Sequence, residues 1–226
     1  MGAGEDRHHS GYFGDPPLLR ATTVAPFQKT ADPTDVAMMR RCIALSQAAT
    51  SEGEYPFATV IALDGEVVAT AINHAVRDGD VSRHAEVIAL SLAQKRLGRK
   101  GLRHATLYTN VEPCAMCSFC VREAQVGRVV YAIGSPVMGG SSKWNILRDE
   151  DMTDRLPQIF GSVPEVVSGL LHQEAEQVWR DWNPLAWHMI KRLGFMTDPA
   201  APVVRVEPAR SWSLWRYLRG LIASGA

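Results

Sequence analysis

The stretch from Phe57 to Asn73 constrains the fold more than any other part of the sequence. It contains two runs rich in β-branched residues, "FATVIAL" and "EVVATAIN", which are separated by Asp64-Gly65. An Asp-Gly pair between two such runs is a strong signal for a β-hairpin, because both residues tolerate the positive φ that a two-residue turn requires. The sequence therefore predicts an antiparallel pair of strands here.

Helical and strand patterns alternate along the rest of the chain. The expected helices cover residues 35–50, 84–97, 115–124, 173–180 and 184–194; the expected strands cover 105–111 and 128–133, and 165–171 is either a strand or the lead into the next helix. Strands joined through helices pair in parallel, because a parallel pair needs a crossover connection. Together with the hairpin, this pattern predicts an α/β fold with a mixed sheet and helices on both faces.

The two ends of the chain differ from its middle. Residues 1–31 are rich in Gly, Pro and charge and lack periodicity, which predicts a flexible N-terminal arm before a single domain over residues 32–195. Residues 196–226 are expected to form a C-terminal extension with a short amphipathic helix. Its apolar face would consist of Leu214, Trp215, Leu218, Leu221 and Ile222. We expect this helix to dock on its own domain or on a neighbouring subunit, and a membrane interface is the alternative.

Charge and cysteine content narrow the classes of protein. The 226 residues carry 24 basic and 24 acidic side chains, so no net charge draws the chain to nucleic acid or to an anionic membrane. We expect no transmembrane segment, because no apolar run approaches about 18 residues, and the N-terminus lacks the apolar core of a secretory signal. Four cysteines, two of them in a Cys-x-x-Cys pair, indicate metal or redox chemistry in a cytoplasmic protein.

Three side chains offer metal ligands at the starts of two expected helices. Cys114 and Cys117 follow Pro113 at a spacing that lets both sulfur atoms face one point, and a helix N-terminus acidifies thiols placed there. His84 adds an imidazole. One imidazole and two thiolates make the three-ligand set of a catalytic zinc ion, whose fourth position is left for water.

Glu86 lies two residues beyond His84, close enough to reach water at that fourth position without becoming a ligand. A carboxylate placed there accepts and returns protons while zinc lowers the pKa of the water. Two alternatives remain open. A structural zinc site would use His74 or His104 as a fourth ligand, and a thiol redox protein would use the cysteines but leave His84 and Glu86 without a role.

The two motifs, His84-Ala85-Glu86 and Pro113-Cys114-Ala115-Met116-Cys117, resemble the H-x-E and P-C-x-x-C signature of the zinc-dependent cytidine/deoxycytidylate deaminase-like superfamily. The resemblance covers about residues 35–180. The segments "ATLYTNVEPCAMC" and "GRVVYAI" are especially similar to bacterial guanine deaminases and tRNA adenosine deaminases.

The resemblance implies a three-layer α/β/α fold with a five-stranded sheet, and usually a homodimer or larger assembly. By position it makes His84, Cys114 and Cys117 the zinc ligands and Glu86 the proton shuttle. Asn73, eleven positions before His84, would hydrogen-bond the substrate ring. These roles imply a hydrolytic deaminase that replaces an exocyclic amine by a carbonyl and releases ammonia.

Phe57 is a candidate for an apolar wall of the substrate site, against which a flat ring would pack, although a phenylalanine in a strand is more often part of the core. The aromatic residues late in the chain are Trp144, Trp179, Trp182 and Trp187, and we expect packing rather than stacking on a base. Cys120 is expected to be a small packed residue rather than a ligand.

Several segments depart from the relatives and leave the substrate open. Ala58-Thr59 replaces an expected small glycine, "DVSR" precedes His84, and "SFCVREAQV" and "SPVMGGSSKWNIL" are unlike both deaminase types. The basic run comprises Lys95, Arg96, Arg99, Lys100 and Arg103, and a solvated helix end explains it better than a phosphate site. We favour a free nucleobase or nucleoside with a purine or purine-like ring. A tRNA-specific adenosine deaminase is the alternative, and a non-catalytic zinc-stabilised binding module is a further one.

Overall fold

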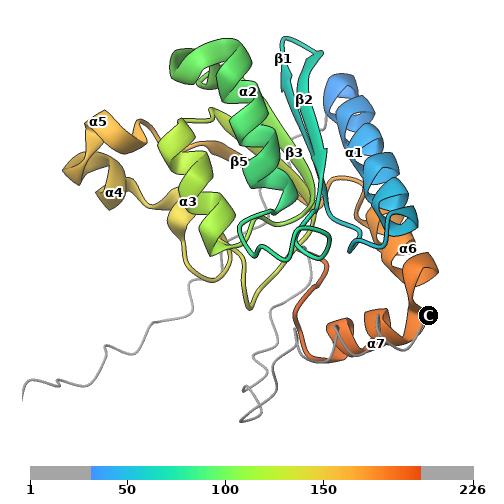
Figure 1. Ribbon diagram of the computed structural model, residues 1–226. Helices are drawn as coiled ribbons and strands as arrows, with labels where there is room; N and C mark the ends of the chain where they lie inside the picture. Colours follow the sequence, from blue (N-terminus) through green and yellow to red (C-terminus); the bar gives the residue numbers. More distant parts are fainter. Residues whose placement is uncertain (1–31, 200–226) are drawn as a thin grey trace, which may run out of the picture.

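The predicted hairpin forms one edge of a five-stranded mixed sheet. The computed structural model describes residues 32–199, and Figure 1 shows its sheet between two layers of helices. The strands are β1 (Ala58–Leu63), β2 (Glu66–Ile72), β3 (Thr106–Val111), β4 (Arg128–Ile133) and β5 (Glu165–Ser168), in the spatial order β2-β1-β3-β4-β5. β1 is antiparallel to β2 and β3, whereas β3, β4 and β5 are parallel. Asp64 and Gly65 both have positive φ, which confirms the turn prediction.

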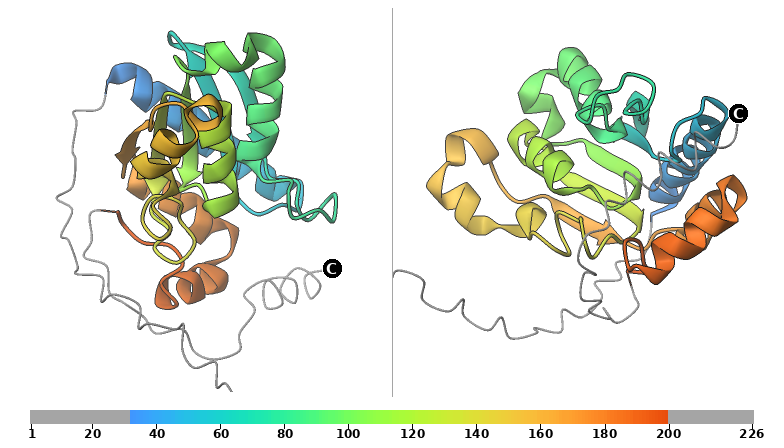
Figure 2. Two further views of the ribbon diagram at one scale, coloured as in Figure 1. Left: turned by 90° about the vertical axis from the view of Figure 1, so that its left-hand side faces the viewer. Right: turned by 60° about the horizontal axis from the view of Figure 1, so that its bottom comes forward.

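Helices cover both faces of the sheet, which confirms the three-layer α/β/α class (Figures 1 and 2). The longer helices are α1 (Pro33–Ser51), α2 (Ala85–Leu102), α3 (Ala115–Ala124), α6 (His172–Trp182) and α7 (Pro184–Arg192). The pair α2 and α3 packs on one face, and α1 and α6 pack on the other. Alternate residues of one strand serve the two cores: Val60 faces α1, and Ile61 faces α2.

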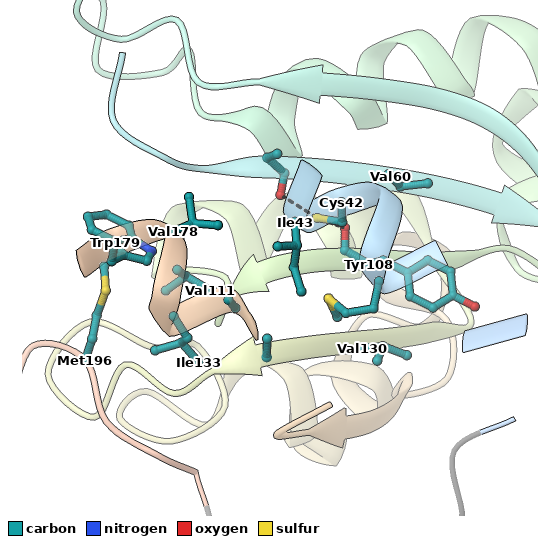
Figure 3. Close-up of a cluster of buried hydrophobic side chains, with 14 of the residues drawn as sticks. Cys42, Ile43, Val60, Tyr108, Val111, Val130, Ile133, Val178, Trp179 and Met196 are labelled. Carbon is teal, nitrogen blue, oxygen red and sulfur yellow. Dashed lines mark hydrogen bonds between the residues drawn. The ribbon is translucent and has the colours of Figure 1, made fainter. Parts of the chain in front are cut away.

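The core beneath α1 and α6 extends to the end of the sheet at which β3 and β4 finish. Figure 3 shows Ile43 from α1, Val130 from β4 and Trp179 from α6 gathered in this cluster. Trp179 is almost fully buried, and Met196 lies beside it. The cluster that holds α1 and α6 on the sheet therefore also holds Trp179 and Met196 near the ends of β3 and β4.

Three short helical segments lie where no helix was expected: η1 (Ile146–Arg148), α4 (Glu150–Arg155) and α5 (Pro157–Phe160). Their position depends on Arg122, a buried residue of α3 whose guanidinium donates hydrogen bonds to the carbonyls of Ile146 and Asp149. The helix expected over residues 84–97 also continues to Leu102, past a non-helical Gly98. Residues 165–171 supply a strand only as far as Ser168.

The segment after α7 crosses the carboxyl ends of the central strands. Gly134 and Thr197 exchange two backbone hydrogen bonds of 2.9 Å, and Ser135 Oγ donates to the Phe195 carbonyl. This contact brings Phe195 and Met196 over the end of the sheet. The expected arm over residues 1–31, and the amphipathic helix expected near the C-terminus, lie outside the described residues. Within residues 32–199, no helix combines the length and apolar character needed to cross a bilayer.

Candidate active site and zinc centre

The three predicted ligands meet where two helices begin. His84 is the N-cap of α2, Cys114 is the N-cap of α3, and Cys117 lies in the first turn of α3. The two sulfur atoms are 3.5 Å apart, and His84 Nδ1 lies 3.6 Å from Cys114 Sγ and 3.4 Å from Cys117 Sγ. Two helix starts, one after β2 and one after β3, thus bring together residues that are 33 positions apart in the sequence.

These distances fit a tetrahedral zinc ion. Zinc–sulfur bonds of about 2.3 Å and zinc–nitrogen bonds of about 2.0 Å place tetrahedral ligand atoms roughly 3.5 to 3.8 Å from one another. The three ligand atoms match this spacing within a few tenths of an ångström. Across residues 32–199, this is the single group of three or more potential metal ligands, and it includes neither His74 nor His104. His74 Nδ1 instead lies 2.7 Å from the Arg77 guanidinium.

The thiols are electrostatically unequal without metal. Their mutual hydrogen bond, together with His84, lowers the pKa of Cys114 to about 4. The same hydrogen bond and burial raise the pKa of Cys117 well above its ordinary value. For His84, burial opposes protonation, but the hydrogen bond to Cys114 and the charge of Glu86 raise its pKa overall. The lowered pKa of Cys114 favours its thiolate, which is the form of cysteine that binds zinc.

Glu86 lies in the first turn of α2 and lines the same pocket as His84 and Cys114. Its side chain is buried, with only 7% of the residue exposed. Burial, followed by the negative charge of Cys114, raises the pKa of Glu86 to about 7. A carboxyl group with this pKa can both donate and accept a proton near neutral pH.

The pocket beside the ligands is mainly apolar. Its apolar wall is formed by Phe57, Val111, Trp179, Ile190, Phe195 and Met196. The Phe57 ring packs edge-to-face on Trp179 at a centroid distance of 4.9 Å. Both residues thus belong to the core and the pocket wall at once, so the alternatives considered for Phe57 are not exclusive.

Asn73 is buried and lines this pocket from the end of β2. Its backbone N–H donates to the Phe57 carbonyl at 3.0 Å, and its side-chain Nδ2 donates to Glu54 at 2.9 Å. The two predicted substrate residues, Asn73 and Phe57, are therefore neighbours on one wall. The structure brings both to the same pocket as Glu86.

Sequence reasoning missed two buried polar residues that shape the pocket. Asn110 in β3 donates to the Pro56 carbonyl and accepts from the Ala58 N–H, so it brackets Phe57 on both sides. Glu112 accepts hydrogen bonds from the loop over residues 135–142, whose Ser135 and Met138 line the pocket. The available signal was the polar ending of the otherwise apolar run "ATLYTNVEP".

The late tryptophans mainly pack, as expected. Trp187 is buried, and Trp182 packs edge-to-face against Trp179 at 5.7 Å. Trp144 is 56% exposed and is not part of the pocket lining. Cys120 packs against the core beneath α2 and α3 and does not join the ligand group.

The basic run lies towards the opposite end of α2 from the zinc ligands. With a rise of about 1.5 Å per residue, Arg96 begins roughly 18 Å from His84 along the helix axis. The Arg96 guanidinium donates to the Val68 carbonyl, and Arg103 donates to Gln125 Oε1 at 2.7 Å. These described contacts support the expectation of a helix end rather than a phosphate site beside the pocket.

Three potential zinc ligands beside a buried carboxylate, set at two helix starts, form the arrangement with which a zinc-dependent hydrolase activates water. Comparison with known proteins identifies the family. The model of the cytidine and deoxycytidylate deaminase zinc-binding region matches residues 32–133. The chain belongs to this deaminase family.

Named relatives span several substrates. A probable cytosine deaminase of Schizosaccharomyces pombe is 31% identical over 138 residues, which cover 61% of this chain and 79% of that protein. The tRNA-specific adenosine deaminase of Bacillus subtilis is 34% identical over 141 residues, covering 62% and 83%. A solved structure of guanine deaminase from Nitrosomonas europaea has a TM-score of 0.53 and 25% identity, covering 80% of this chain and 100% of that chain. The shared reaction is deamination, and the substrates differ.

Proposed function

We propose that this zinc-dependent deaminase acts on a free nucleobase or nucleoside with a purine or purine-like ring. The observation that carries the proposal is the form of the pocket. Phe57 and Trp179 form an apolar wall beside the zinc ligands, and Phe195 and Met196 also line the pocket. A pocket of this kind suits a small planar ring. Of the basic run, Arg96 and Arg103 make their contacts towards the end of α2 that is remote from His84.

His84, Cys114 and Cys117 would hold the zinc ion, which would lower the pKa of a water molecule that serves as the nucleophile. Glu86 would accept a proton from that water and deliver it to a ring nitrogen. It would then take the second proton from the hydroxyl group added to the ring carbon and deliver it to the departing amine. The carbon–nitrogen bond to the amine breaks as a carbonyl forms, so water and the amino ring give ammonia and the oxo ring. The N-termini of α2 and α3 carry partial positive charge, which favours the negative charge that develops on the oxygen added to the amine-bearing ring carbon.

Asn73 would orient the ring through a hydrogen bond, and Phe57 would contact its face or edge. Both side chains line the pocket together with Glu86. Binding of the ring in one orientation would place its amine-bearing carbon near the zinc ligands, which lowers the entropic part of the barrier.

The second candidate is a tRNA-specific adenosine deaminase. It is favoured by the similarity to the Bacillus subtilis enzyme of that name. An ammonia-release assay separates the two. Zinc-loaded protein would be offered adenine, guanine, cytosine, their nucleosides, amino-triazines and tRNA. Release from a free base or nucleoside supports the first candidate, and release from tRNA alone supports the second. A zinc-loaded protein without activity on any of them would favour the non-catalytic binding module.

We further propose that the chain forms a homodimer. Phe119, Val137 and Trp144 are exposed apolar side chains on α3 and the loop after β4, and a second copy would cover such a surface. Light scattering coupled to size exclusion tests this, because a molar mass near 24.8 kDa would contradict it.

We propose a cytoplasmic location, since the four cysteines are free thiols and free thiols are typical of a reducing compartment. We also propose that the reaction belongs to the domain over residues 32–195. Cell fractionation tests the location, and recovery of the activity in a secreted or membrane fraction would contradict it. Limited proteolysis followed by the ammonia assay tests the domain assignment.

A further inference from the structure

Glu54 is a buried carboxylate that the reaction described above does not use. Only 1% of the residue is exposed, and it lies in the connection between α1 and β1. Gly53 has φ of +76°, and the Glu54 N–H donates to the Ala49 carbonyl at 3.1 Å. This is the Schellman ending of a helix, in which glycine takes the left-handed position. The end of α1 therefore fixes the backbone from which the Glu54 side chain projects.

Three donors from the end of β2 and the following loop converge on this carboxylate. Asn73 Nδ2 donates to Oε2 at 2.9 Å, the Val76 N–H donates to the same oxygen at 3.3 Å, and the Arg77 N–H donates to Oε1 at 2.7 Å. The two backbone donors orient the carboxylate plane. The carboxylate in turn accepts a charge-assisted hydrogen bond from the Asn73 amide.

This contact decides which way the Asn73 amide faces. A carboxylate only accepts hydrogen bonds, so the NH2 group of Asn73 must lie on the Glu54 side. The Asn73 backbone is held from another direction by its hydrogen bond to the Phe57 carbonyl. The carbonyl oxygen Oδ1 and the second Nδ2 hydrogen are then left for other partners, in a side chain that lines the pocket.

We infer that Glu54 is a positioning residue that sets the direction in which Asn73 presents its amide to the substrate ring. The inference rests on the proposed function, because it assigns Asn73 to substrate. Glu54 itself does not line the pocket. Its effect on the reaction passes through Asn73.

Glu54 is not needed to place His84, the zinc ligand that follows the loop over residues 74–83. The His74 N–H donates to the Arg83 carbonyl at 2.9 Å and closes the loop at its base, directly before His84. Asp78 Oδ2 accepts from the Arg83 guanidinium at 3.0 Å. The loop over residues 74–83 thus has its own internal contacts, and loss of the Glu54 charge leaves the position of His84 supported.

The test is a double-mutant cycle on Glu54→Gln and Asn73→Ala. Glutamine keeps the side-chain length but replaces one oxygen by NH2, so it cannot accept from both Asn73 and Arg77. We expect Glu54→Gln to lower kcat/KM about tenfold, in line with the loss of one oriented hydrogen bond. The double variant is expected to be no worse than Asn73→Ala alone. Glu52→Gln is the matched control, because it removes an exposed carboxylate two positions away and leaves kcat/KM unchanged.

Zinc content is measured in every variant, and about one ion per chain is expected throughout. Two results would overturn the inference: a Glu54→Gln effect that persists in the Asn73→Ala background, or loss of zinc from Glu54→Gln. The first would place Glu54 outside the Asn73 pathway, and the second would make it a support of His84.

If the wild-type protein releases ammonia from no substrate, the proposed function fails, and a readout without turnover decides about Glu54. The side-chain NH2 signal of Asn73 is identified in NMR spectra by its absence from Asn73→Ala. Its hydrogen exchange with water is expected to be slow in the wild type and faster in Glu54→Gln. Equal exchange in the two proteins would overturn the positioning role.

Discussion

Replacing Glu112 by glutamine tests how the pocket loop is held. Glu112 is 3% exposed and accepts from the N–H groups of Ser135, Ser141 and Ser142 at 2.8, 3.0 and 2.7 Å, and from Ser142 Oγ at 2.8 Å. Oε1 receives the Ser141 and Ser142 backbone donors, and Oε2 receives Ser135 and the hydroxyl. A glutamine side chain keeps one acceptor oxygen and turns the other position into a donor.

The better orientation of glutamine puts its NH2 group at the Oε2 position. The Ser142 hydroxyl can then reverse and accept, so one buried backbone N–H, that of Ser135, loses its partner. One unsatisfied buried donor costs about 1–3 kcal/mol. The opposite orientation leaves two backbone donors without partners and roughly doubles the cost. For a chain of this size, the first case lowers Tm by roughly 2 to 12 °C.

Urea and thermal unfolding of zinc-loaded protein measure this cost, and Glu66→Gln, at an exposed position beside the hairpin turn, is the control. The loop also contacts the start of α3, beside the zinc ligands Cys114 and Cys117, because the Ala115 N–H donates to the Met138 carbonyl at 3.2 Å. We therefore expect KM to rise in Glu112→Gln. An unfolding free energy within about 0.5 kcal/mol of the wild type would refute the reasoning, since surface changes have effects of that size.

Further predictions concern acid stability, metal removal and loop packing. Burial opposes ionisation of Asp35, but hydrogen bonds from Arg128 and Tyr108 lower its pKa overall. The stability that Asp35 contributes is therefore present above the unfolded pKa of about 4 and is lost as pH falls through the folded pKa. The unfolding free energy of the wild type should thus fall more steeply in acid than that of Asp35→Asn, and parallel pH profiles would contradict this. A chelator should release zinc and expose Cys114. The freed thiol should react rapidly with a thiol reagent near neutral pH, because its pKa is lowered to about 4. Equal labelling rates of Cys114 before and after chelation would count against its assignment as a zinc ligand. Gly140→Ala should destabilise the loop after β4, since the alanine Cβ would clash with the Ser118 side chain of α3. An unchanged Tm would show that the loop does not pack on α3 as described.

The parts of the fold that sequence reasoning predicted are those set by local contacts. Asp64-Gly65 predicted the hairpin because the turn needs positive φ at two successive residues, whatever the surroundings. The helix starts at His84 and Cys114 were also visible from sequence. Their meeting point was inferred from ligand chemistry, because three suitable donors at workable spacing define one zinc ion.

The parts that were missed depend on contacts between distant segments. Glu54 meets Asn73 across 19 positions, and Arg122 meets the Asp149 carbonyl across 27. No periodicity or spacing links such partners. The short helices after β4 had visible local signals, since Asp149 caps α4 and Pro157 begins α5. The polar composition of this segment concealed them, because it lacks an extended apolar face.

The central claim is that Glu86 carries the proton of a hydrolytic deamination at a zinc ion that it does not bind. The most direct measurement compares zinc content and ammonia release for the wild type and Glu86→Gln on the best substrate. The account predicts about one zinc ion per chain in both proteins and a loss of at least about 100-fold in kcat for the variant. Comparable rates in the two proteins would contradict the role of Glu86, and loss of zinc from the variant would contradict the three-ligand centre.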